Sequence, residues 1–98
     1  MFVDGIWCVK PYREKKVFEN YIISIENTDL IIELNETAYT ILTIIKKGQC
    51  SVITLNSIIE EIQEVFNLNL VTTSELKSDV CEILDFYISC GLLYPAND

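Results

Sequence analysis

The four cysteines are the most reactive side chains in this sequence, because the chain contains no histidine. They are widely spaced and form no C-x-x-C pair: Cys8, Cys50, Cys81 and Cys90. A zinc site would require them to converge from separate elements, so buried or half-buried free thiols in a reducing compartment are the expected state. Without histidine, the chain also lacks Ser-His or Cys-His nucleophile activation and the most common general base. These observations disfavour an enzyme such as a cysteine peptidase, and they predict neither a metal nor a cofactor.

The net charge limits the possible partners. The 98 residues include 7 Lys and Arg against 15 Asp and Glu, which gives a net charge of −8. Affinity for nucleic acid depends on basic side chains that displace counterions from phosphates, so a nucleic-acid partner is disfavoured. The same excess of negative charge keeps a small apolar domain soluble.

The composition is that of a folded domain. Hydrophobic residues make up 50% of the chain, which is too many for a disordered protein. The apolar runs are too short to span a membrane, so no membrane partner is expected. The first five residues have neither a basic start nor a long apolar stretch, so we expect no signal peptide and a cytoplasmic location. Residues 1–98 are expected to form one domain with a modest core.

The elements of the chain are organised around Asn35, where the hydrophobic period changes. The preceding apolar residues alternate with polar ones, as in a strand: Leu30, Ile32 and Leu34. The following apolar residues have the spacing of one helix face: Ala38, Ile41, Leu42 and Ile45. We expect Asn35 to cap a helix over residues 36–47 and Gly48 to end it in the left-handed conformation.

Short strands are expected before this helix. Residues 5–10 have the pattern of a strand that Pro11 ends, and the basic run 12–16 is interpreted as a solvated, charged connection. A further strand could begin at Val17. The segments 21–25 and 30–34 are rich in β-branched residues, and the turn residues 26–29 join them into a hairpin.

Two further helices are expected after the first. Thr54 is expected to cap a helix whose apolar face runs from Leu55 to Phe66, and residues 67–71 interrupt the pattern. Thr72 and Glu75 fit a capping box for a third helix that ends at Gly91. The chain is therefore predicted to be an α+β domain of winged-helix style, with a three-stranded antiparallel sheet followed by three helices.

The third helix is apolar over roughly 220° of its circumference, about twice the arc that a surface helix needs. Beside a central line of core residues, one flank carries Cys81, Leu84 and Ile88, and the other carries Phe86 and Cys90. Either neighbouring elements cover both flanks, or one flank lines an open groove. The strand 29–34 is expected at a sheet edge with unpaired backbone groups. An exposed edge beside an apolar groove would suit the addition of a peptide as an extra strand.

Two sequence segments carry a family resemblance. Leu34-Asn35-Glu36-Thr37-Ala38 followed by Ile41-Leu42 resembles the signature LN-(D/E)-(S/T)-A…IL of PqqD-like proteins. The C-terminal part is similar to the family pattern DV..FL..L…GLL at Asp79-Val80, Ile83-Leu84, Tyr87 and Gly91-Leu92-Leu93. The resemblance covers residues 17–94. It implies a stand-alone recognition element for the precursors of ribosomally synthesised and post-translationally modified peptides (RiPPs).

The resemblance also implies a function and a site. The leader region of a precursor peptide would add as a strand beside the third helix, without catalysis by this chain. A separate radical SAM enzyme, cyclase or leader peptidase would then modify the precursor. Carried over by position, the peptide-binding residues are Asp29, Leu30, Ile31, Ile32 and Glu33 on the strand and Lys77, Cys81, Leu84 and Ile88 on the helix.

The resemblance leaves some points open. The helix flank of Phe86 and Cys90 is an alternative wall for the site. Asn35, Ala38 and Gly91 match the motif as fold residues only. The turn 26–29 lacks the glycine common in members that serve pyrroloquinoline quinone synthesis, which favours a lasso-peptide or radical-enzyme pathway. A winged-helix regulator that binds DNA is the alternative function.

Overall fold

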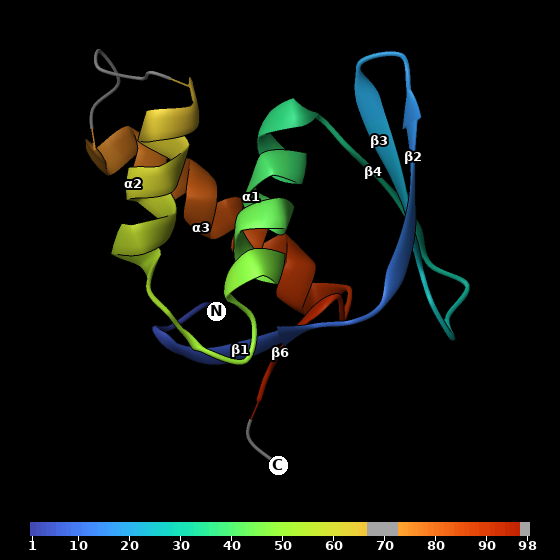
Figure 1. The fold of residues 1–98 in the computed structure, drawn as a ribbon, viewed down its shortest axis with the longest axis horizontal. Helices are drawn as coiled ribbons and strands as arrows, with labels where there is room; N and C mark the ends of the chain where they lie inside the picture. The colour runs from blue at the N-terminus through green and yellow to red at the C-terminus, as the bar shows by residue number, and fades with distance from the viewer. Residues whose placement is uncertain (67–72, 97–98) are drawn as a thin grey trace.

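The computed structural model describes residues 1–66 and 73–96. They form two three-stranded antiparallel sheets and three helices, so the predicted α+β class is confirmed. The elements, in chain order, are β1 (Gly5–Val9), β2 (Tyr12–Val17), β3 (Asn20–Ile25), β4 (Ile31–Leu34), α1 (Glu36–Gly48), β5 (Val52–Ile53), α2 (Leu55–Phe66), α3 (Thr73–Ser89) and β6 (Leu93–Pro95). Figure 1 shows the sheet of β2, β3 and β4 beside α1, α3 crossing behind α1, and β1 with β6 below the helices.

The first sheet is a meander in the order β2-β3-β4, which is followed by the three helices as predicted. The interpretation of residues 12–16 as a charged connection is wrong, because these residues form β2 and pair with β3 along its whole length. Charged side chains are common on edge strands, where they oppose aggregation. The hairpin between β3 and β4 is confirmed, and Asn27 takes the left-handed conformation in its turn, with φ of 63°.

The two faces of the meander differ sharply. Directly opposite residues of antiparallel strands share a face. Ile23 lies opposite Ile32 and Tyr21 opposite Leu34, on the inner face that packs against α1. Ile22 lies opposite Glu33 and Ser24 opposite Ile31, on the outer face, where the Ile31 side chain is 67% exposed. A strand added to β4 would therefore meet apolar side chains on its inner face.

The second sheet has the order β5-β1-β6 and was not expected. The predicted strand near the N-terminus is β1, but it pairs with β5 and β6 rather than joining the meander. Phe2 stacks on Trp7 with ring centroids 5.2 Å apart, and both side chains are buried. The Lys10 amide donates to the Leu92 carbonyl oxygen at 2.8 Å. The packed core therefore includes residues that precede the segment of family resemblance.

Helix ends follow the predicted capping chemistry in part. The Asn35 side-chain oxygen accepts from the Ala38 amide at 2.9 Å, as predicted, and the Thr54 hydroxyl accepts from the Ser57 amide at 3.1 Å. Gly91 is left-handed, with φ of 82°, and follows the end of α3. The prediction for Gly48 is wrong, because the left-handed residue after α1 is Cys50, with φ of 68°. Thr72 and residues 67–71 lie outside the described residues.

One core joins the helices to both sheets. Each helix contributes its apolar face, with Ile41 and Ile45 of α1 and Ile58 and Ile62 of α2 all fully buried. Full burial of such a side chain stabilises the fold by about 1.5–3 kcal/mol. α3 packs chiefly against α2 and β6, and its residues Glu82, Ile83 and Phe86 lie near the end of β4. Among the described residues, no helix combines the length and hydropathy needed to cross a membrane.

Candidate functional site

The outer edge of β4 carries backbone groups that no described strand uses, since β4 pairs only with β3. The Ile25 amide donates to the Leu30 carbonyl oxygen at 3.1 Å, which marks residues 25 and 30 as a hydrogen-bonded pair. Hydrogen-bonded and non-hydrogen-bonded pairs alternate in antiparallel sheets. Given the register of β3 and β4, the N–H and C=O groups of Ile31 and Glu33 therefore point away from β3. The predicted edge position of this strand is confirmed.

A groove of about 360 Å³ lies between the β4–α1 junction and α3. We call it the β4–α3 groove; it is lined by Glu33, Leu34, Asn35, Ala38, Glu82, Ile83 and Phe86. Leu34 and Ala38 are buried, so they form its floor. Ile83 is half-buried and Phe86 is 44% exposed, so these side chains form an apolar wall on α3. An apolar side chain could therefore lie between β4 and α3.

A buried hydrogen bond links α3 to α1 beside this groove. The Tyr87 hydroxyl donates to the backbone carbonyl oxygen of Ala38, in the first turn of α1. Tyr87 is fully buried, and this burial raises the pKa of its phenol above the ordinary value. The neighbouring residue Phe86 is thereby held beside Ala38 and the end of β4. The groove is thus built on packed elements rather than on loops.

The two flanks of α3 have different surroundings. At 100° per residue, Asp85 lies on the side of α3 away from Ile83. Its Oδ1 accepts a hydrogen bond of 2.9 Å from the Phe2 amide. The flank of Cys81 and Ile88 is therefore turned toward the N-terminal segment, and the flank of Phe86 is turned toward β4.

The structure brings together only some of the residues predicted for the site. On the strand, Ile31 and Glu33 are exposed and Ile32 is half-buried on the inner face, while Asp29 and Leu30 precede β4 and are exposed. The predicted helical residues Lys77, Cys81, Leu84 and Ile88 do not line the β4–α3 groove. Leu84 has an exposure of 0% and belongs to the core. Of the flank left open by the sequence, Phe86 lines the groove, together with the predicted core residue Ile83.

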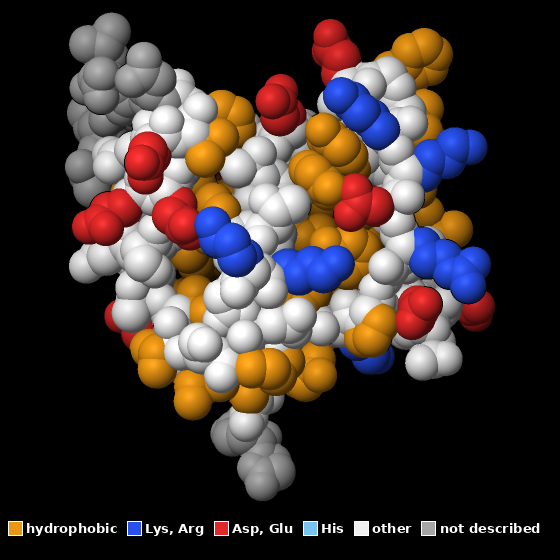
Figure 2. Space-filling model, viewed as in Figure 1, with side chains coloured by type: hydrophobic (Ala, Val, Ile, Leu, Met, Phe, Trp, Pro, Cys, Tyr) orange, Lys and Arg blue, Asp and Glu red, His pale blue; other side chains and the backbone are white. Residues whose placement is uncertain are grey.

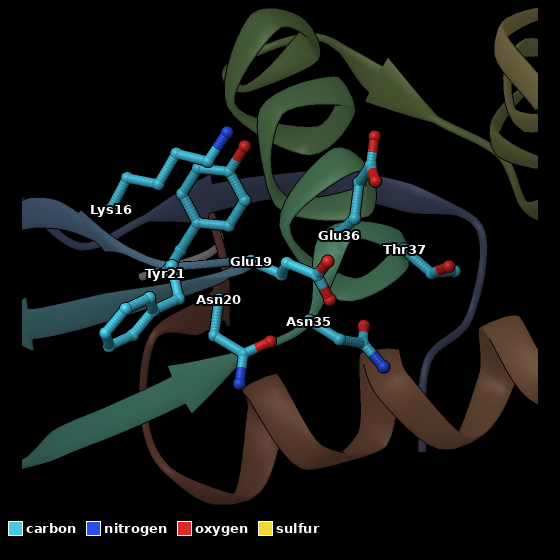
Figure 3. Close-up of a pocket in the computed structure, with 8 residues that line it drawn as sticks. Lys16, Glu19, Asn20, Tyr21, Asn35, Glu36 and Thr37 are labelled. Atoms are coloured by element: carbon cyan, nitrogen blue, oxygen red, sulfur yellow. The ribbon is translucent and has the colours of Figure 1, made fainter.

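A second hollow, of about 460 Å³, lies between the β2–β3 turn and the start of α1 (Figure 3). Three of its polar side chains, Asn35, Asn20 and Lys16, already have partners within the fold. Asn35 caps α1, and the Asn20 side-chain amide donates to Glu33 Oε2 at 2.5 Å. The Lys16 ammonium lies 5.6 Å from the centre of the Tyr21 ring, and Figure 3 shows its chain extending along that ring. We therefore do not assign a binding role to this hollow.

Aromatic and charged side chains on the inner faces of β2 and β3 attach the sheet to α1. The Tyr21 and Tyr39 rings stack with centroids 3.7 Å apart. The Tyr39 hydroxyl donates to the Glu14 carboxylate, and this hydrogen bond, together with partial burial, raises the pKa of Tyr39 above its ordinary value. The Lys46 ammonium lies 4.6 Å from the centre of the Tyr12 ring. These contacts orient the meander, and hence β4, relative to the helices.

The cysteines do not gather into one site. Cys8 and Cys50 approach each other with their sulfur atoms 4.0 Å apart, while Cys81 and Cys90 lie on α3 and at its end. Cys50 is exposed, which corrects the expectation that all four thiols are buried or half-buried. Within residues 1–66 and 73–96, no three acidic or cysteine side chains are placed to hold a metal ion.

Comparison with known proteins identifies a structural relative but no sequence family. No protein-family model and no curated protein matches the chain. Among solved structures, "TbiB1 in Complex with the TbiA(beta) Leader Peptide" superposes with a TM-score of 0.70 at 13% sequence identity. The match covers 93% of this chain and 99% of that chain. The two proteins therefore share a fold over nearly their whole lengths.

Proposed function

We propose that this chain captures the leader region of a ribosomally synthesised precursor peptide, which adds as a fourth strand along β4. The open edge of β4 beside the β4–α3 groove is the observation that carries the proposal. The backbone groups of Ile31 and Glu33 would bind the leader backbone, and Ile83 and Phe86 would contact its inward side chains. Two independent likenesses support this function: the PqqD-like sequence motifs, and the fold shared with a protein solved in complex with a leader peptide.

The same geometry indicates which contacts would provide affinity and which would provide selectivity. Hydrogen bonds to Ile31 and Glu33 involve only the main chain, so they are available to any extended peptide. Side chains alternate along a strand, and every second one would face the groove. Selectivity would then depend on the fit of those side chains against Leu34, Ile83 and Phe86.

The bound leader would present the rest of the precursor to a separate enzyme, without chemistry by this chain. A radical SAM enzyme, a cyclase or a leader peptidase is the class of partner that the PqqD-like resemblance implies. Tethering the precursor raises the local concentration of its modifiable segment at that enzyme's active site. The acidic exposed residues of α3, Asp79 and Glu82, give no support to the DNA-binding alternative, which requires basic contacts to phosphates.

The proposal is tested with an unbiased probe. A displayed library of random dodecapeptides is selected on the immobilised chain, and an enriched sequence, here called the selected peptide, is synthesised. Titration of the ¹⁵N-labelled protein with the selected peptide should shift the amide resonances of residues 31–34 and 82–87. Shifts confined to β2 or α2 would place binding elsewhere. Failure to enrich any peptide on folded protein would contradict the proposed function.

A further inference from the structure

Both walls of the β4–α3 groove carry negative charge. Glu33 lies on the β4 side and Glu82 on the α3 side, and both are exposed. Asp79 is also exposed and lies one turn before Glu82 and Ile83 on α3. No lysine or arginine is among the residues that line the groove. A guest strand would therefore lie over an apolar floor between two acidic rims.

The position of Glu33 determines which side chains of a guest strand would lie near its negative charge. Glu33 belongs to the outer face of the meander, so its carboxylate would neighbour the outward side chains of a guest strand. Asn20 donates to one of its oxygens, and a carboxylate has further acceptor positions for an incoming donor. The inward side chains of the same guest would meet Leu34, Ile83 and Phe86. The two faces of the guest would thus require different chemistry.

The opposite edge of the same sheet carries the opposite charge. β2 contributes Arg13, Lys15 and Lys16 against Glu14, and Figure 2 shows blue side chains over this part of the molecule. A basic peptide would be repelled from the edge of β2 and attracted to that of β4. The edges of β2 and β4 offer similar backbone groups, but the charges beside them differ in sign, which would distinguish the two edges for a basic peptide. This local difference does not follow from the net charge of the whole chain.

Resting on the proposed function, we infer that the guest is a basic leader segment in which apolar residues alternate with lysine or arginine. The apolar side chains face the β4–α3 groove, and the basic ones pair with Glu33 on the outer face and with Glu82 at the rim. A cross-strand pair of opposite charges strengthens binding by about 1.4- to 5-fold. Two such pairs would favour a basic segment over an equally apolar neutral one.

The test compares the sequences selected by three proteins from the same random dodecapeptide library. They are the wild type, the groove variant Glu33→Lys/Glu82→Lys, and the control variant Glu60→Lys/Glu64→Lys. The control changes two exposed acidic residues of α2, so it alters the net charge equally without touching the groove. We expect wild type and control to enrich peptides with alternating apolar and basic residues. The groove variant should lose this preference or favour aspartate and glutamate.

The outcomes separate the two levels of the proposal. The inferred preference for basic peptides would be overturned if the wild type enriched neutral or acidic peptides, or if the groove variant enriched the same basic peptides. Strand addition itself would not be contradicted by either result. Absence of enrichment on all three folded proteins would overturn strand addition itself.

As a second measurement, the affinity of the wild type for its selected peptide should fall severalfold between 50 and 500 mM NaCl, roughly the range over which exposed charges become screened. A salt-independent affinity would overturn the inferred preference for basic peptides.

Discussion

The Tyr87 hydroxyl donates to the backbone carbonyl oxygen of Ala38, so a buried side chain of α3 holds the first turn of α1. Ala38 lines the β4–α3 groove, and Phe86, the residue before Tyr87, lines its other side. The two walls of the groove are therefore connected through one bond inside the core. Stability of the fold and geometry of the site depend on the same contact.

Replacing Tyr87 with phenylalanine should therefore lower both stability and affinity. The change keeps the ring and removes one buried hydrogen bond, which costs about 1 kcal/mol of unfolding free energy. Urea unfolding followed by circular dichroism measures this loss, and titration with the selected peptide should show a severalfold weaker affinity. An unchanged unfolding free energy would mean that the bond does not hold α3 to α1.

The buried and hydrogen-bonded tyrosines also predict how stability depends on pH. The pKa values of Tyr87 and Tyr39 are raised in the folded chain, by burial for Tyr87 and chiefly by the Glu14 hydrogen bond for Tyr39. Above the ordinary tyrosine pKa of about 10, the unfolded chain releases protons that the folded chain retains. The unfolding free energy is then lowered as pH rises. This contribution is fully present below pH of about 10.

We expect the melting temperature to fall between pH 10 and pH 12, and to fall less steeply for Tyr87→Phe than for the wild type. Thermal unfolding at half-unit pH steps measures both slopes, with absorbance of tyrosinate at 295 nm as an internal record of deprotonation. Identical slopes for the two proteins would show that Tyr87 ionises in the folded state without penalty.

The sequence predicts the β4–α1 junction correctly because its signals are local. Asn35 caps the helix through a contact with Ala38, three residues away, and the hydrophobic period changes at the same point. The sequence does not predict β2, because the four consecutive charged residues 13–16 lack the alternation of polar and apolar residues that is typical of a strand. Its strand character comes from pairing with β3, and the pairing of β1 with β5 and β6 likewise depends on contacts between distant segments.

The site shows the same division between local and distant signals. The exposed edge of β4 follows from the order of the hairpin strands. The α3 flank that faces β4 cannot be predicted in this way, because Phe86 on one flank and Cys81 and Ile88 on the other are all apolar. The flank that faces β4 is decided by contacts far apart in sequence: Tyr87 with Ala38, and Asp85 with Phe2.

Replacing Ile31 with proline should abolish binding of the selected peptide while the fold persists. The Ile31 amide points away from β3, so proline removes a donor to the guest without breaking the pairing within the meander. We expect at least about a tenfold loss of affinity, because one hydrogen bond is lost and the ring obstructs the edge. The control Ile31→Thr keeps both the amide and a β-branched side chain, so it should bind nearly as well as the wild type. Equal affinities for the proline and threonine variants would exclude strand addition at this position.

The two flanks of α3 can be compared directly with a pair of substitutions. Phe86→Ala removes a half-exposed ring from the wall of the β4–α3 groove, and should weaken binding of the selected peptide about tenfold, as expected for an aromatic contact residue. Cys81→Ala changes the opposite flank, which does not line the groove, and should leave affinity unchanged. Because Phe86 is 44% exposed, its removal should alter the melting temperature by little, so that a change in affinity reports on contact rather than on unfolding. If the alanine at position 81 weakens binding and the one at position 86 does not, the guest lies against the flank of Cys81 and Ile88, as the family motif implied.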